Sequence, residues 1–245
     1  MAKLLVIENS NIVKGVFKSL LDVEEDFDYD LASSFKEAKE FLSKSRYEFA
    51  ISERVLEDAP HGEIIALLNK HNVAPLLFTK TIDEDFFEAF EGAKIVDYII
   101  KDKYNNISNV IERLKQLLQN KKRTVLVVSD SHIFNSYLRQ SLNLHSFKVL
   151  SAANNEEAYA KIDKHPNIAL MIIDNKEPYL DALSLVKEVR KYRSHNELKI
   201  LAIAQESNSY LTSQLLNAGA NDFIVKEFSR SELYVRVYQN VNKFS

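Results

Sequence analysis

Two aspartates and a lysine in the second half of the chain follow short apolar runs that have the length of buried strands. Asp130 comes after Val125–Val128, Asp174 after Ala169–Ile173, and Lys226 after Phe223–Val225. Ligands of open parallel sheets bind beyond the carboxyl ends of the strands, so these side chains are expected to converge. Two clustered carboxylates need a neutralising cation, and an oxygen-only ligand set favours Mg²⁺. With the lysine added, the pattern predicts phosphoryl transfer to an aspartate oxygen.

The same residues allow a structural interpretation. Asp130 and Asp174 would cap the helices that follow them, and Lys226 would be their counter-ion at the surface. For any one of the three alone this interpretation is favoured. Their coincidence at three strand ends favours the functional site.

The chain repeats itself, and the repeat identifies the elements that must position these residues. Leu5–Ser10 matches Leu126–Ser131, Ala50–Glu53 matches Met171–Asp174, and Asp97–Lys101 matches Asp222–Lys226. A repeat of this length predicts two domains of the same fold, residues 1–121 and 122–245. The boundary is expected near Gln119–Arg123, where the absence of Pro and Gly would allow the last helix of the first half to run on and stiffen the link. The basic cluster Lys121–Arg123 is expected to be a solvated linker, with a docking patch as the alternative.

In each half, short apolar runs alternate with longer segments of helical period. Four runs in each half predict strands: Leu4–Ile7, Phe49–Ile51, Leu76–Phe78, Tyr98–Ile100, Val125–Val128, Ala169–Ile173, Ile200–Ile203 and Phe223–Val225. A less apolar strand near Tyr29–Ala32 and near Lys148–Ala152 is expected at an edge. Continuously apolar strands are buried on both faces, which predicts a parallel sheet covered by helices and hence an α/β, doubly wound fold.

Composition excludes several classes of function. The formal charge of −3 is too small to indicate a nucleic acid or anionic membrane partner, and the absence of cysteine excludes disulfide and thiolate chemistry. The four glycines form no phosphate-binding loop, and no apolar run approaches the length of a membrane span. We therefore expect a cytoplasmic protein. The six histidines have no metal-ligand spacing and are expected at the surface.

The second half resembles the receiver domain of bacterial two-component response regulators. The resemblance rests on Asp130, on Asp174 with Pro178 four residues later, and on the segment Gly219–Lys226. It extends over nearly the whole chain, twice, and implies two tandem flavodoxin-like (βα)5 receiver domains, each with a five-stranded parallel sheet.

The resemblance also implies roles for individual residues. Asp174 would accept a phosphoryl group from the phosphohistidine of a sensor histidine kinase or a histidine phosphotransfer protein. Lys226 would contact the phosphoryl oxygens. Asp130, Asp174 and the backbone carbonyl of Lys176 would bind Mg²⁺, and Phe223 would be the aromatic switch residue.

The second half departs from the family pattern at three positions. Ser129 replaces the first of two acids, which predicts weakened Mg²⁺ binding. Ala204 replaces the switch threonine or serine, so the hydroxyl that would bond the phosphoryl group is absent, unless the nearby loop bends back to bring Ser207 into its place. Glu227 replaces a proline and adds negative charge near the site.

The first half departs more strongly. Glu8 and Asn9 replace the acid pair, and Glu53 stands at the acceptor position. The switch hydroxyl, the aromatic residue and the lysine are retained, as Thr79, Tyr98 and Lys101. We expect a pseudo-receiver that is held permanently in one state. The alternative is that Glu53 forms an ion pair with Lys101 and signals nothing.

These features favour a phosphorelay signalling protein in which the second domain is phosphorylated and the first is a regulatory or dimerisation module. The family's usual dimer face would include the helices Ile107–Leu118 and Leu233–Val241. A constitutive interaction module with no phosphorylation remains an alternative. A phosphatase with an aspartate nucleophile is disfavoured, because such enzymes have a second aspartate two residues after the first, where this chain has Lys176.

No enzymatic or DNA-binding output domain is recognisable in the sequence, so we expect no enzyme activity in this chain itself. Tandem receivers that resemble this pair often precede a diguanylate cyclase domain. The chain is therefore expected to be either part of such a regulator or a separate adaptor.

Overall fold

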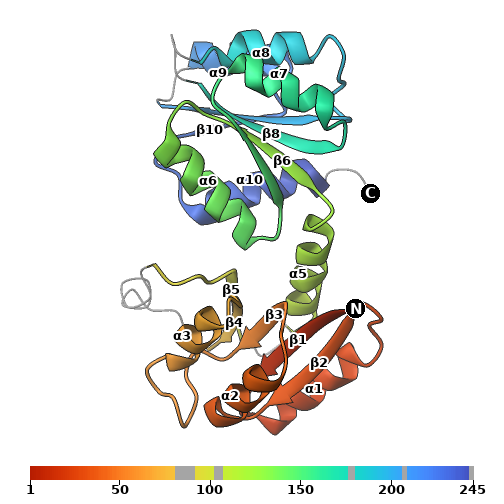
Figure 1. The fold of residues 1–245 in the computed structure, drawn as a ribbon, viewed down its shortest axis with the longest axis vertical. Helices are drawn as coiled ribbons and strands as arrows, with labels where there is room; N and C mark the ends of the chain where they lie inside the picture. The colour runs from red at the N-terminus through yellow and green to blue at the C-terminus, as the bar shows by residue number, and fades with distance from the viewer. Residues whose placement is uncertain (81–91, 102–106, 176–179, 206–208, 243–245) are drawn as a thin grey trace. The chain divides into compact units, whose positions relative to one another are not determined.

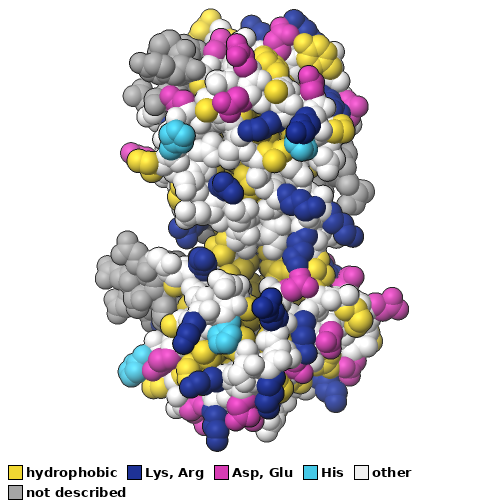
Figure 2. Space-filling model, in the orientation of Figure 1, with side chains coloured by type: hydrophobic (Ala, Val, Ile, Leu, Met, Phe, Trp, Pro, Cys, Tyr) yellow, Lys and Arg dark blue, Asp and Glu magenta, His cyan; other side chains and the backbone are white. Residues whose placement is uncertain are grey.

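The computed structural model describes residues 1–80, 92–101, 107–175, 180–205 and 209–242 (Figure 1). Contacts divide the chain into two compact units, Met1–Leu117 (unit 1) and Leu118–Ser245 (unit 2). None of the described helices is both long enough and apolar enough to cross a membrane. On the face of each unit that Figure 2 shows, basic and acidic side chains are interspersed.

Unit 1 contains a five-stranded parallel sheet in the order β2-β1-β3-β4-β5. Its strands are β1 (Ala2–Ile7), β2 (Phe27–Ala32), β3 (Phe49–Ser52), β4 (Pro75–Thr79) and β5 (Asp97–Ile100). Its described helices are α1 (Asn11–Leu21), α2 (Phe35–Lys44), α3 (Glu63–Lys70) and most of α5 (Ile107–Asn120).

Unit 2 repeats this arrangement with a second five-stranded parallel sheet, in the order β7-β6-β8-β9-β10. The strands are β6 (Thr124–Val128), β7 (Lys148–Ala152), β8 (Ile168–Asn175), β9 (Lys199–Ala204) and β10 (Asp222–Val225). The helices are α6 (His132–Leu144), α7 (Asn155–Lys164), α8 (Ala182–Val189), α9 (Ser209–Ala218) and α10 (Arg230–Asn242).

The predicted fold is confirmed: both sheets have the flavodoxin-like strand order, and the two less apolar strands, β2 and β7, lie at edges. In this order the second and third strands lie on opposite sides of the first, so the direction in which strands are added to the sheet reverses between the first and third strands of each unit. That switch point is where open α/β sheets bind ligands. In unit 2 it lies between the ends of β6 and β8, and in unit 1 between the ends of β1 and β3.

Burial on both faces explains why the strands are continuously apolar. In β6, Leu126 and Val128 pack with α7, α8 and α9, whereas Val125 and Val127 pack with α6 and α10. Figure 1 shows these two groups of helices on opposite sides of the sheet. Successive side chains of a strand point to opposite faces, so each face needs its own apolar set.

Serine caps fix the start of the first helix in each unit. Ser10 accepts a hydrogen bond from Val13 N at 3.4 Å, and Ser131 accepts one from Phe134 N at 3.3 Å. A serine oxygen at this position satisfies one of the free amides of the first turn. The first turns of α1 and α6 are thereby held directly after the ends of β1 and β6.

The last helix of the first half runs on to Asn120 at the boundary, where Lys122 is exposed but its neighbours are partly or fully buried. One histidine is not at the surface. Asn120 is fully buried and donates to His145 O at 3.0 Å and to Tyr238 Oη at 3.2 Å. His145 is fully buried too, with Nδ1 3.2 Å from Tyr238 Oη. Arg123 donates to Asn242 Oδ1 at 2.7 Å, and burial lowers the pKa of its guanidinium. Spacing rules for metal ligands could not reveal a histidine that is buried for packing.

A partly buried arginine connects the end of α8 to the segments just before β9 and β10 in unit 2. Arg190 donates to the carbonyl oxygens of Gly219 at 2.8 Å and Leu198 at 2.9 Å, and to Asn221 Oδ1 at 2.9 Å. Gly219 has φ +115°, and a Cβ built there would lie 2.7 Å from Arg190 Cγ. Asn69 makes a similar connection in unit 1 through Lys94 N and O.

Gly219→Ala is expected to destabilise unit 2 by about 1–3 kcal/mol, because the backbone conformation is unfavourable for a side chain and the methyl group collides with Arg190. Gly15→Ala is the control: it lies within α1, nothing is within 4 Å of the added Cβ, and it should stabilise by about 0.5–1 kcal/mol. Denaturant unfolding followed by circular dichroism measures both. Equal changes in the free energy of unfolding for the two substitutions would contradict the close packing of Arg190 against Gly219.

Candidate functional site

Three strand ends of unit 2 converge on Asp174, as the sequence predicts. Asp174 lies inside β8, paired with Ile203 of β9, so the strand is longer than its apolar run. Ser129 and Asp130 directly follow β6, and Lys226 directly follows β10. Hydrogen bonds fix both connections, from Ser129 N to Ala152 O at 3.0 Å and from Lys226 N to Ala204 O at 2.8 Å.

The carboxylate of Asp174 has one partner on each oxygen. Lys226 Nζ lies 2.8 Å from Oδ1, and Ser129 Oγ donates to Oδ2 at 2.9 Å. The Asp174 side chain is fully buried, whereas that of Lys226 is 19% exposed. An ammonium and a hydroxyl therefore hold the carboxylate in place at the open edge of the sheet.

The capping interpretation is wrong for both aspartates. Ser131 caps α6, and Asp181 caps α8 by accepting from Ser184 N at 2.9 Å. Asn175, not Asp174, accepts a hydrogen bond from Ala182 N, at 3.2 Å. Asp174 is thus not the N-cap of the helix that follows it.

The donor set of this site fits the expected Mg²⁺. Asp130 and Asp174 supply carboxylate oxygens from neighbouring strands, and with Lys226 they leave one unit of negative charge. Oδ1 of Asp174 is buried and accepts no hydrogen bond, although the lysine ammonium is beside it. In the described part of the chain, no cluster of three or more His, Asp or Glu side chains could hold a metal, so bound Mg²⁺ would retain several waters. Lys176, the third expected ligand, and Pro178 lie outside the described residues.

The lysine also lies against an aromatic ring, which the sequence did not identify as part of the site. Lys226 Nζ lies 4.6 Å from the ring centroid of Phe134, in the first turn of α6. Phe134 in turn contacts the rings of Phe228 and Tyr137, each 6.2 Å away between centroids. A cation over an aromatic face is attracted by the ring quadrupole. The sequence feature that could have indicated this contact is a phenylalanine four residues after Asp130. Apolar periodicity alone does not distinguish such a residue from one that packs in the core.

The predicted switch positions lie near these strand ends. Ala204 is buried at the end of β9, and Thr79 is buried at the corresponding end of β4. Phe223 and Tyr98 are both partly buried, and each packs against the core cluster on one face of its sheet. Ser207 lies outside the described residues. Glu227 is exposed and has φ +73°, a left-handed conformation in the position after the lysine.

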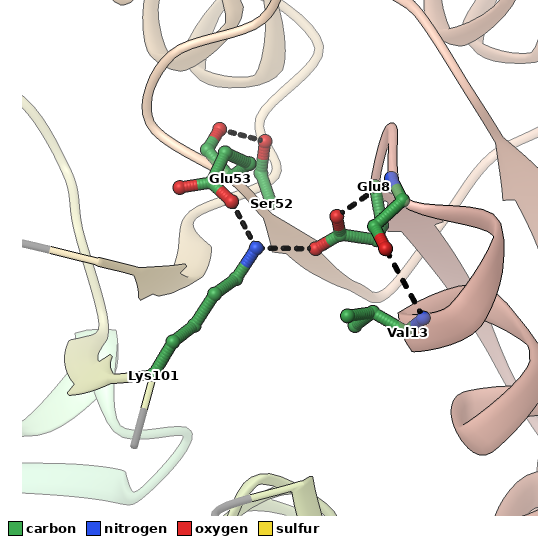
Figure 3. A network of polar contacts seen from close by, with 6 residues as sticks. Glu8, Val13, Ser52, Glu53 and Lys101 are labelled. Carbon is green, nitrogen blue, oxygen red and sulfur yellow. Dashed lines mark hydrogen bonds and ion pairs between the residues drawn. The ribbon is translucent and has the colours of Figure 1, made fainter. Parts of the chain in front are cut away.

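The corresponding site of unit 1 holds its lysine between two carboxylates. Lys101 Nζ lies 2.6 Å from Glu8 Oε2 and also pairs with Glu53 Oε2. Figure 3 shows the ammonium of Lys101 lying between these two side chains, which come from the ends of β1 and β3. Glu8 Oε1 accepts a further hydrogen bond from Ser10 N, at 2.9 Å.

The expected ion pair between Glu53 and Lys101 is therefore present, and Glu8 is an additional partner that was not foreseen. The three side chains are nearly buried, with exposures of 2% for Glu8, 8% for Glu53 and 13% for Lys101. Asn9, at the position of a direct metal ligand, is exposed. The ammonium thus contacts both carboxylates and compensates one of their two negative charges.

Comparisons with known proteins agree with this geometry. The response regulator receiver domain model matches residues 125–238. The chemotaxis protein CheY1 of Helicobacter pylori is 32% identical over 106 residues, which cover 43% of this chain and 86% of that protein. The transcriptional regulatory protein KdpE of Staphylococcus aureus is 32% identical over 115 residues, and this chain spans 47% of its length.

One solved structure is similar over both units. It is a crystal structure described as a putative two-component system response regulator/GGDEF domain protein, with a TM-score of 0.87 and 28% identity over 99% of each chain. Two flavodoxin-like sheets, the converging acid and lysine residues and these likenesses lead to one conclusion: the chain belongs to the response regulator receiver family of two-component signalling proteins.

Proposed function

We propose that unit 2 accepts a phosphoryl group on Asp174 from the phosphohistidine of a sensor histidine kinase or a histidine phosphotransfer protein. The observation that carries the proposal is the buried Asp174 carboxylate, with Lys226 on one oxygen and Ser129 on the other, at the switch point of the sheet. Buried charge that no helix cap requires is typical of a functional site.

In the proposed transfer, the bond from phosphorus to the donor's imidazole nitrogen breaks and a bond from phosphorus to an Asp174 carboxylate oxygen forms. The nitrogen keeps the electron pair of the broken bond and takes a proton from solvent. The Lys226 ammonium would stabilise the negative charge that develops on the phosphoryl oxygens. Mg²⁺, held by Asp130 and Asp174, would supply further neutralisation of that charge. Ser129 contributes a hydroxyl in place of a carboxylate, so the site has less negative charge with which to hold the metal.

We further propose that unit 1 is a pseudo-receiver that is not phosphorylated and acts as a regulatory or dimerisation module. Glutamate at the acceptor position and the ammonium of Lys101 between Glu53 and Glu8 support this. A positive charge already satisfies both carboxylates, so a metal ion would have to displace it.

The proposed assembly is a homodimer that regulates an output domain. In each unit an arginine of the last helix pairs with an aspartate of the fifth strand, Arg113 with Asp97 and Arg236 with Asp222. These pairs lie on the face formed by the fifth strand and the last helix, which receiver families use for dimers. The likeness to a response regulator/GGDEF domain protein supports a diguanylate cyclase as the output.

Incubation with Mg²⁺ and phosphoramidate is expected to add the mass of one phosphoryl group, as measured by intact mass spectrometry. Asp174→Asn should abolish the adduct, because the amide is a poor nucleophile, and chelation of Mg²⁺ should reduce it strongly. Asp181→Asn removes the same charge at an exposed helix cap and should keep the adduct. Equal adducts in both variants would show that Asp174 is not the acceptor. No adduct in the wild-type protein would favour the constitutive interaction module.

Lys101→Met is expected to lower the free energy of unfolding of unit 1 by about 3–5 kcal/mol, because two nearly buried carboxylates lose their counter-ion. Lys115→Met removes a more exposed pair with Glu24 and should cost less than about 1 kcal/mol. Denaturant unfolding of the full chain measures both. Similar small losses would mean that the buried ion cluster does not stabilise unit 1.

Glu53→Gln tests whether unit 1 is held in one state. The substitution keeps the shape of the side chain but removes a charge from Lys101, so it should change the thermal stability and the oligomeric state of the full chain. Light scattering after size-exclusion chromatography and thermal unfolding measure these. If neither quantity changes, the ion pair has no signalling role.

A further inference from the structure

We propose that the first turn of α6 reads the phosphorylation state of Asp174, with Ser129 and Phe134 as the positioning residues that connect them. This inference rests on the proposed function of Asp174 as the acceptor. It concerns the step after phosphorylation, for which Ala204 leaves no side-chain hydroxyl at the end of β9.

The first connection runs through hydrogen bonds. Ser129 Oγ donates to Asp174 Oδ2 at 2.9 Å and accepts from Ser131 N at 3.3 Å. Ser131 is the N-cap of α6, and its own Oγ accepts from Phe134 N at 3.3 Å. A change in the hydrogen bond of Ser129 therefore reaches the cap of the helix through two successive contacts.

The second connection runs through the lysine. Lys226 pairs with Asp174 Oδ1 at 2.8 Å while its ammonium lies 4.6 Å from the centroid of the Phe134 ring. Phe134 belongs to the same first turn of α6. The two connections form a closed ring of contacts from Asp174 to α6 and back, within unit 2.

A phosphoryl group on Asp174 would act on both connections at once. Its oxygens attract the Lys226 ammonium, which changes the contact with Phe134, and they offer Ser129 a new acceptor in place of Oδ2. Both changes act on the same turn, because Ser131 and Phe134 are three residues apart in one helix start. At the end of the neighbouring strand β9, Ala204 provides a methyl group in place of a hydroxyl.

Unit 1 provides a comparison within the same chain. Its first helix start has the same cap, with Ser10 accepting from Val13 N, but Val13 stands where unit 2 has Phe134. Lys101 instead lies 5.2 Å from the ring of Phe78, a residue of β4. Phe78 in turn contacts the ring of Phe17 of α1, with 5.7 Å between centroids. The lysine of unit 2 thus contacts an aromatic ring of the first helical turn directly, whereas in unit 1 the contact passes through a strand residue to a later turn of α1.

Hydrogen–deuterium exchange of the full chain, with and without Mg²⁺ and phosphoramidate, tests this proposal. In the wild-type protein, phosphorylation should change the exchange rate of amides in residues 131–135 by about two- to fivefold, the range that loss of a cation–π contact allows. Exchange is normalised to the phosphorylated fraction given by intact mass. Ser129→Ala and Phe134→Leu should each reduce the change, and the double variant should lose it.

Ile133→Ala is the matched control, because Ile133 lies in the same turn but is 86% exposed. It should keep the full response. A phosphorylated wild-type protein with unchanged exchange at residues 131–135, or a double variant that responds like the wild type, would overturn the inference while leaving Asp174 as the acceptor. Absence of the adduct in the wild type would overturn both proposals.

Discussion

The contact on which the rest of the site depends is a lysine ammonium held against a buried carboxylate at the carboxyl edge of each sheet. Burying a carboxylate is costly unless a cation and hydrogen-bond donors accompany it. Asp174 meets this condition with Lys226 and Ser129, and Glu53 meets it with Lys101. Each lysine comes from the fifth strand and each acid from the third, so the sheet order itself brings the charges together.

The two units place their carboxylates differently on one scaffold, although each site has two acids and one lysine. In unit 1, the carboxylates of Glu8 and Glu53 share one ammonium, so the site is already occupied by protein charge. In unit 2, a serine stands in the place of Glu8, and the Asp174–Lys226 pair is neutral by itself. The lysine of unit 1 thus lies between two carboxylates, whereas the lysine of unit 2 pairs with one carboxylate, whose second oxygen accepts from a serine hydroxyl.

The surroundings of the two lysines extend this difference to the helices. Lys226 connects Asp174 to the first turn of α6 through Phe134, whereas Lys101 lies over Phe78 within the sheet. The serine caps that begin α1 and α6 are the same in both units. The lysine of each unit therefore reaches the start of its first helix by a different contact, through the Phe134 ring in unit 2 and through Glu8 and the amide of Ser10 in unit 1.

The sequence by itself determined the repeat, the type of strand order, the edge strands and the meeting of Asp174 with Lys226, because these follow from apolar periodicity and from the common edge of parallel strands. The tertiary structure alone decided which atoms meet: Ser129 on Asp174, Glu8 on Lys101, and Phe134 under Lys226. It also buried His145 and Asn120. Such contacts depend on side-chain directions and on packing between elements distant in sequence, which residue types and spacing do not specify.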